Sequence, residues 1–182
     1  TALGKAVLKK AKPAAGGRSA KLTWSKTAGA SGYVISRASS AGGRYKNVKT
    51  ISNGSKLSYT DRKLAPGRTY FYKVRAYRQV KGKKVFGADS NVKSVQVKPG
   101  TVKGFRAVRA GSSVELEWKA VKGVTGYRVY RASSKKGTYQ AIGTSKKTSY
   151  RDGKTATGRT YYYKVRAYKK VNGKNVYGNY SK

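Results

Sequence analysis

The sequence contains no cysteine and no histidine, and only 5 of its 182 residues are acidic. Zinc centres with Cys or His ligands, thiol chemistry and histidine-based catalytic triads are therefore excluded. The lack of cysteine leaves the redox compartment open, because disulfide-free domains occur in every compartment. No apolar run approaches the roughly 20 residues of a membrane-spanning helix. We predict a chain with no transmembrane segment, no metal and no cofactor.

The scarcity of acids leaves a large excess of positive charge. Lys and Arg number 43, and the net charge is +38. The charge is spread along the chain, since residues 1–98 hold 23 basic and 2 acidic residues and residues 99–182 hold 20 and 3. We therefore expect a cationic folded body that attracts polyanions. A few units of net charge suffice for solubility, so solubility does not explain this excess.

The chain is an internal duplication. The segment GRTYFYKVRAY (Gly67–Tyr77) recurs as GRTYYYKVRAY (Gly158–Tyr168), with ten of eleven positions identical. Other residues repeat at an offset of 94 before Ile51 and of 91 after it. Short alternating apolar and polar runs, separated by Gly, Ser and Asn, are typical of β-sandwiches. The sequence predicts an all-β protein of two tandem sandwiches, over residues 1–98 and 101–182, with a linker at 99–100.

The two copies differ at their ends. The first copy closes with a predicted strand at 91–97, whereas the counterparts of residues 92–97 do not occur in the second copy. We expect the central strand of the second sandwich to lose part of a neighbour and to expose an edge. Because the sequence begins at Thr1 rather than Met, we also expect it to be part of a longer protein.

Four groups of residues carry a family resemblance: Trp24, Gly32–Ile35, Leu64–Gly67 and Tyr70–Ala76. Together they resemble the fibronectin type III domain, an immunoglobulin-like β-sandwich. The resemblance implies that Trp24 lies in the core and that Leu64 and Tyr70 lock the corner before the sixth strand. In the second copy Trp118 and Tyr161 match, but Thr155 replaces Leu64, which implies a looser corner.

Three further segments are similar to tandem repeats of secreted or surface proteins of Gram-positive, clostridia-like bacteria. These segments are SRASSAGGRYK, YRASSKKGTYQ and YKKVNGKNVYG. The resemblance implies a protein that is secreted or held at the cell surface or in the cell wall. It fixes the fold far better than the function, since such sandwiches serve as spacers, adhesion modules and binding modules alike.

The outward side of the central strand is the first candidate site. Residues at alternate positions of a strand face the same side, so cations and aromatic rings alternate there with the buried residues. The candidate cations are Lys73, Arg75, Arg128, Lys164 and Arg166, and the candidate aromatic face is Phe71, Tyr77, Tyr130, Tyr162 and Tyr168. Such a surface could bind phosphates or sulfates and stack on sugars or bases. The alternative is ordinary cross-strand pairing, in which rings cover the stems of Lys and Arg.

Lysines at the hairpin after the central strand form the second candidate. They are Lys81, Lys83, Lys84, Lys169, Lys170 and Lys174. Lysine is a flexible point charge, which suits diffuse contact with a polyanion better than a shaped pocket. Solvated loop residues without a ligand are the alternative.

The few acids do not indicate catalysis. Glu115 and Glu117 lie about 7 Å apart if they share one face of a strand, within the range of an inverting glycosidase pair. However, the alternation points both away from the core on a convex sheet, so we expect local ion pairs and no enzyme activity. Asp61 and Asp152 recur at one strand end, where we expect a turn or backbone-capping role.

The sequence thus predicts a non-enzymatic cationic module that binds polyanions electrostatically. Candidate partners are teichoic-acid-like polymers, sulfated or sialylated glycans, nucleic acid and acidic membrane surfaces. The alternatives are a structural spacer or stalk of a bacterial surface protein, and an adhesion module for a specific protein such as a host receptor.

Overall fold

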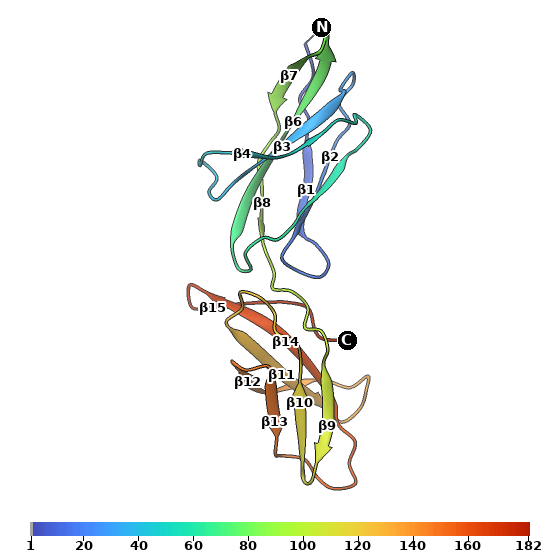
Figure 1. Cartoon of the computed structure of the whole chain (residues 1–182), viewed down its shortest axis with the longest axis vertical. Coiled ribbons are helices and arrows are strands. Elements are labelled where there is room, and N and C mark those ends of the chain that lie inside the picture. The colour runs from blue at the N-terminus through green and yellow to red at the C-terminus, as the bar shows by residue number, and fades with distance from the viewer. Residues whose placement is uncertain (1) are drawn as a thin grey trace. The chain divides into compact units, whose positions relative to one another are not determined.

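The computed structural model describes residues 2–182, which form β-strands and no helix (Figure 1). The chain divides into two compact units, unit 1 ending at Val97 and unit 2 covering Lys98–Lys182. The strands of unit 1 are β1 (Leu8–Pro13), β2 (Ala20–Trp24), β3 (Gly32–Ala38), β4 (Lys46–Ile51), β5 (Ser58–Asp61), β6 (Thr69–Val80), β7 (Lys83–Asp89) and β8 (Lys93–Gln96). Those of unit 2 are β9 (Arg106–Ala110), β10 (Ser113–Glu117), β11 (Gly126–Ala132), β12 (Gln140–Ser145), β13 (Ser149–Asp152), β14 (Tyr162–Val171) and β15 (Lys174–Tyr177).

Unit 1 is a sandwich of two antiparallel sheets. The smaller sheet has the order β1-β2-β5, and the larger has the order β4-β3-β6-β7, with β8 also paired to β6. The core lies between them and is built from alternate residues of each strand. The prediction that Tyr70, Tyr72, Val74 and Ala76 face the core is confirmed, because all four are buried in it.

Unit 2 repeats this architecture with sheets β13-β10-β9 and β12-β11-β14-β15. Its core includes Leu116, Trp118, Val129 and Val165. The predicted all-β fold of two tandem sandwiches is confirmed. Trp24 and Trp118 are both buried, as the resemblance implied.

The described residues of the two units differ beside the start of the central strand. In unit 1, β8 pairs with the start of β6, from Thr69 to Tyr72, and delivers Val95 into the core. In the described part of unit 2 no strand pairs with the start of β14 in this way. β8 is shorter than the predicted 91–97. The side chain of Asn91 instead accepts a hydrogen bond from the Leu8 amide and donates one to the Leu8 carbonyl.

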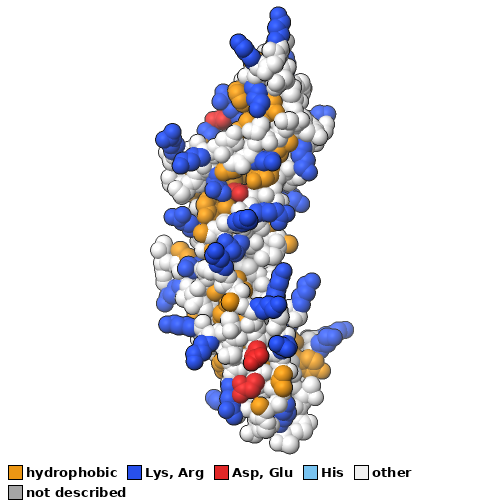
Figure 2. Space-filling model, in the orientation of Figure 1, with side chains coloured by type: hydrophobic (Ala, Val, Ile, Leu, Met, Phe, Trp, Pro, Cys, Tyr) orange, Lys and Arg blue, Asp and Glu red, His pale blue; other side chains and the backbone are white. Residues whose placement is uncertain are grey.

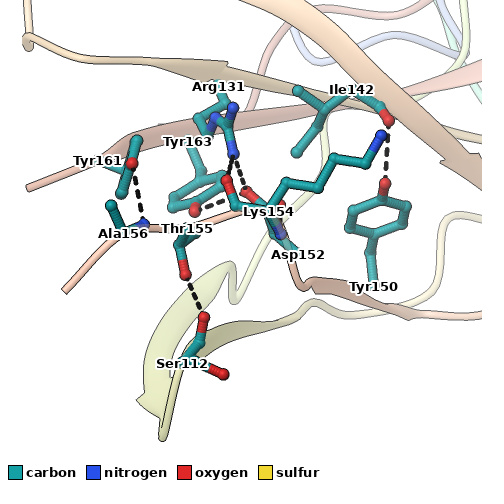
Figure 3. A network of polar contacts seen from close by, with 10 residues as sticks. All are labelled: Ser112, Arg131, Ile142, Tyr150, Asp152, Lys154, Thr155, Ala156, Tyr161 and Tyr163. Carbon is teal, nitrogen blue, oxygen red and sulfur yellow. Dashed lines mark hydrogen bonds and ion pairs between the residues drawn. The ribbon is translucent and has the colours of Figure 1, made fainter. Parts of the chain in front are cut away.

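The corner before the central strand is closed by a tyrosine hydroxyl in both units. The hydroxyl of Tyr70 accepts a hydrogen bond of 3.3 Å from the Ala65 amide, and that of Tyr161 accepts one of 3.1 Å from Ala156 (Figure 3). Leu64 packs into the core of unit 1, whereas its counterpart Thr155 donates to the Ser112 carbonyl. Tyr161 is only half-buried, so the second corner is less enclosed than the first.

Candidate ligand-binding face

The outward side of the sheet β4-β3-β6-β7, called here the unit-1 face, carries two cations beside one carboxylate. Asp89 Oδ2 lies 2.6 Å from Lys73 Nζ, and Asp89 Oδ1 lies 4.0 Å from Arg75 Nε. Lys73 Nζ also lies 4.6 Å from the centre of the Tyr45 ring, and the Arg75 guanidinium carbon 4.9 Å from that of Phe86. These residues border a shallow hollow of about 340 Å³.

The outward side of β12-β11-β14-β15, called here the unit-2 face, carries cations among tyrosines. Arg166 lies at its centre, its guanidinium carbon 3.9 Å from the Tyr177 ring centre, 4.7 Å from that of Tyr180 and 5.1 Å from that of Tyr130. Lys164 Nζ lies 3.9 Å from the centre of the Tyr139 ring. Each contact has the geometry of a cation–π interaction.

Two hydrogen bonds fix the guanidinium groups of the unit-2 face. Arg166 Nε donates to the Tyr130 hydroxyl at 2.8 Å, and Arg128 Nη1 donates to the Tyr177 hydroxyl at 2.9 Å. Burial alone would raise the pKa of Tyr177. This effect is outweighed by hydrogen bonds from Arg128 and Asn175 and by the nearby guanidinium charges, so the pKa of Tyr177 lies below its usual value. The hydrogen bond to Tyr177 is the main cause of a raised pKa for Arg128. The face is therefore a pre-ordered cationic surface.

Several exchanged residues separate the two faces, among them Val34 for Arg128 and Ser36 for Tyr130 at the offset of 94. At the offset of 91, Tyr180 of unit 2 stands where unit 1 has Asp89. The following serine anchors this segment to the central strand in both units, since Ser90 Oγ accepts from the Val74 amide and Ser181 Oγ from the Val165 amide. The carboxylate of the unit-1 face is thus replaced by a ring on the unit-2 face.

The predicted strand cations therefore do gather on the two faces, with Lys73 and Arg75 on one and Arg128, Lys164 and Arg166 on the other. The hairpin lysines are spread more widely. Lys84 Nζ lies over the Tyr77 ring at 4.9 Å, and so belongs to the unit-1 face. The remaining members, Lys81, Lys83, Lys169, Lys170 and Lys174, lie in or beside the hairpins β6–β7 and β14–β15.

The prediction of a water-facing aromatic row is wrong for two of its members. Tyr77 is only 2% exposed and Tyr130 only 6%, although both point away from the core. Phe86 and Lys84 cover Tyr77, and Arg166 and Tyr180 cover Tyr130. The other predicted rings, Phe71, Tyr162 and Tyr168, are half-buried. Long neighbours on adjacent strands close over the rings, as in ordinary cross-strand pairing.

Sequence reasoning missed the residues that complete each face, which come from strands or loops beside the central strand. They are Tyr45, Phe86 and Asp89 in unit 1 and Tyr139, Tyr177 and Tyr180 in unit 2. The signal that could have found them was the alignment of the two copies. It pairs Tyr45 with Tyr139 and sets Asp89 against Tyr180.

The prediction that Asp61 and Asp152 serve as turn caps misses their main contacts. Asp152 Oδ2 accepts from Arg131 Nη1 and from the Tyr163 hydroxyl, each at 2.9 Å (Figure 3). Asp61 Oδ2 accepts in the same way from Arg37 at 2.7 Å and from Tyr72 at 2.9 Å. Only Asp152 also caps a backbone amide, that of Lys154. Each aspartate thus ties its own sheet to the opposite sheet.

One of the remaining acids forms an ion pair on its own sheet. Glu115 Oε1 lies 3.3 Å from Arg151 Nε, which is the local ion pair that the sequence predicted. Among residues 2–182, no group of three His, Cys, Asp or Glu side chains is placed to hold a metal ion. No helix in the described chain is long and apolar enough to cross a membrane.

Positive charge covers both units (Figure 2). Ion pairs in the described residues engage only Arg37, Lys73, Arg75, Arg131 and Arg151. With 43 basic residues in the chain, most of the cationic side chains therefore have no carboxylate partner.

Comparison with known proteins supports the fold. No model of a protein family matches the sequence, and no curated protein sequence matches it either. A two-domain fibronectin type III segment of chicken tenascin is similar over 98% of this chain and 98% of its own, with 17% identity and a TM-score of 0.58.

Two further solved structures are similar at lower TM-scores. The FN1–FN3 domains of chicken CNTN1 cover all of this chain with 17% identity and a TM-score of 0.44, and this chain spans 66% of that protein's length. A Fn3-like protein from Clostridium thermocellum is 31% identical, with a TM-score of 0.43, over 52% of this chain and 91% of its own.

Proposed function

We propose that this chain, a tandem pair of domains with the fibronectin type III fold, is a non-enzymatic module that binds polyanions through its cationic surface. The fold fits a structural or binding module. The observation that carries the finer proposal is the unneutralised charge: 43 basic residues face 5 acids, and the ion pairs engage few of the cations. A surface of this kind raises the local concentration of anionic partners and speeds their association.

The proposed setting is outside the cell, in secreted form or at the cell surface or wall. Anionic cell-wall polymers of the teichoic-acid kind, sulfated or sialylated glycans, nucleic acid and acidic membranes all offer the required charge. Cationic surfaces of this density adhere to such partners with little specificity. A spacer without a ligand, and a module for a host surface protein, are the other functions that the fold permits.

The test is binding of the whole chain to heparin, to duplex DNA and to lipoteichoic acid at two salt concentrations. Electrostatic binding should weaken steeply with salt, with a log–log slope of about −0.9 for each phosphate neutralised on duplex DNA. Replacing Lys135, Lys136, Lys146 and Lys147 by Ser removes four positive charges at exposed positions of unit 2 and should weaken all three interactions. Absence of binding to every polymer at about 0.15 M salt, where charges are screened beyond about 8 Å, would contradict the proposal and favour a spacer.

A further inference from the structure

The unit-2 face holds two like charges directly opposite each other. Arg128 on β11 pairs with Arg166 on β14 in the antiparallel register. Side chains at such positions lie on the same side of the sheet, and like charges there destabilise it. Unit 1 has Val34 opposite Arg75 at the same place, and therefore avoids this repulsion.

A third cation extends the cluster. Lys164 lies two residues before Arg166 on β14, so the two side chains share a face at a spacing of roughly 7 Å. The acids of unit 2 lie on the other sheet, Glu115 and Glu117 on β10 and Asp152 on β13. The three cations of the unit-2 face thus have rings, but no carboxylate, beside them.

The rings of this face indicate which polyanion it suits. Strands of unpaired bases need a row of free ring faces for stacking. Here cations lie over the rings of Tyr130, Tyr139, Tyr177 and Tyr180, and Tyr180, at 40% exposed, is the most open of the four. A sugar ring can lay its C–H face on one such tyrosine while its anionic groups receive charge-assisted hydrogen bonds from the cations.

We propose that the unit-2 face is a selective site for an acidic polysaccharide, with Arg128, Lys164 and Arg166 binding its sulfate or carboxylate groups and Tyr180 packing against a sugar ring. Unit 1 lacks this site because Asp89 pairs with Lys73 and lies 4.0 Å from Arg75, and because Val34 stands where unit 2 has Arg128. This inference rests on the proposed function, since it names the place and the ligand class within the general binding of polyanions.

The test exchanges the distinguishing residue in the whole chain and uses a heparin octasaccharide as the probe. Tyr180→Asp places a carboxylate beside Lys164 and Arg166 and lowers the net charge by one. Lys146→Ser, at an exposed position between β12 and β13, lowers it by the same amount and is the matched control. Tyr180→Asp should weaken binding about tenfold more than Lys146→Ser. The reason is that the new carboxylate would pair with the cations that otherwise donate charge-assisted hydrogen bonds to the octasaccharide. Asp89→Tyr should strengthen binding at the unit-1 face but leave it weaker than the unit-2 face, since Val34 stands where unit 2 has Arg128.

The ligand class has its own test. Tyr180→Ala keeps the net charge and should weaken octasaccharide binding severalfold, but leave binding of a 12-base-pair DNA duplex unchanged, because a duplex presents phosphates and no free ring faces. An equal loss for the octasaccharide and a single-stranded oligonucleotide would contradict the choice of polysaccharide. Retained protection of the Val165 amide from exchange verifies that each variant of unit 2 is folded.

Failure of this inference differs from failure of the proposed function. If the unaltered chain binds heparin but Tyr180→Asp and Lys146→Ser weaken binding equally, the selective site does not exist and diffuse binding remains. If the unaltered chain binds no polyanion at physiological salt, the proposed function itself is wrong.

Discussion

Unit 1 and unit 2 have the same core, and they differ at the edge of the central strand and on its outward face. Both place a tryptophan, an Arg–Asp–Tyr network and a tyrosine corner at matching positions. Unit 1 has β8 along the start of β6, and Asp89 pairs with a cation of its outward face. In the described residues of unit 2 no strand pairs with the start of β14, and no carboxylate pairs with the cations of its outward face.

This comparison separates what maintains the sandwich from what varies on it. Residues that connect the two sheets are repeated, because losing them would leave buried polar groups without partners. Residues on the outward face differ between the units, and they lie outside the core that joins the two sheets. The exchange of Asp for Tyr therefore changes the electrostatic field of the face with little consequence for the fold.

The largest expected effect tests the shared network. Asp61→Ala should destabilise unit 1 by about 3 kcal/mol, because it leaves Arg37 and the Tyr72 hydroxyl without their partner. Asp152→Ala should destabilise unit 2 by a similar amount through Arg131 and Tyr163.

Urea unfolding measures each unit separately, because each contains one of the two tryptophans. In a Trp118→Phe background the fluorescence reports unit 1 through Trp24, and Trp24→Phe makes the chain report unit 2. A loss below about 1 kcal/mol in either unit, the size of an ordinary hydrogen bond, would show that the network does not hold the sheets together.

The next effect concerns the strand that only unit 1 possesses. Val95→Ala should cost unit 1 about 2 kcal/mol, from two lost methyl groups and the cavity they leave. The exposed Val108 on β9 provides the control, since Val108→Ala should leave unit 2 within about 0.5 kcal/mol of its original stability. If Val95→Ala has no effect on the unfolding of unit 1, β8 is not the stabilising difference between the units.

The smallest effect is alkaline destabilisation. Burial first, and then Asp61, raise the pKa of Tyr72 above its usual value of 10.0, so the folded unit keeps this proton at pH values where the unfolded chain releases it. Tyr72 therefore contributes stability that is complete below pH 10 and declines above it, by about 1.4 kcal/mol per pH unit. Tyr72→Phe should make unit 1 less sensitive between pH 10 and 11 in the same fluorescence assay. An unchanged pH slope would contradict this assignment.

Much of the fold was predictable from the sequence, because it follows from local alternation and from duplication. Tyr70, Tyr72, Val74 and Ala76 alternate with polar residues, and strand period alone assigns them to the core.

The site was less predictable, because it depends on contacts between residues distant in the sequence. Alternation shows that Tyr77 and Tyr130 point outward, but not that Phe86 or Arg166 covers them. The contact of Asp61 with Arg37 crosses from one sheet to the other, and strand period carries no information about such a crossing. A polar residue repeated at a strand end is equally consistent with a turn cap.

The most direct test of the account is an NMR titration of the whole chain with a heparin octasaccharide, following the side-chain Nε–H signals of Arg75, Arg128 and Arg166 and the ring of Tyr180. The account predicts saturable shifts at Arg128, Arg166 and Tyr180, and little change at Arg75, whose Nε–H donates to the Gly87 carbonyl at 2.7 Å and lies 4.0 Å from Asp89 Oδ1. Shifts of equal size and equal midpoint at Arg75 and Arg166 would show that the two faces are equivalent, and would contradict it.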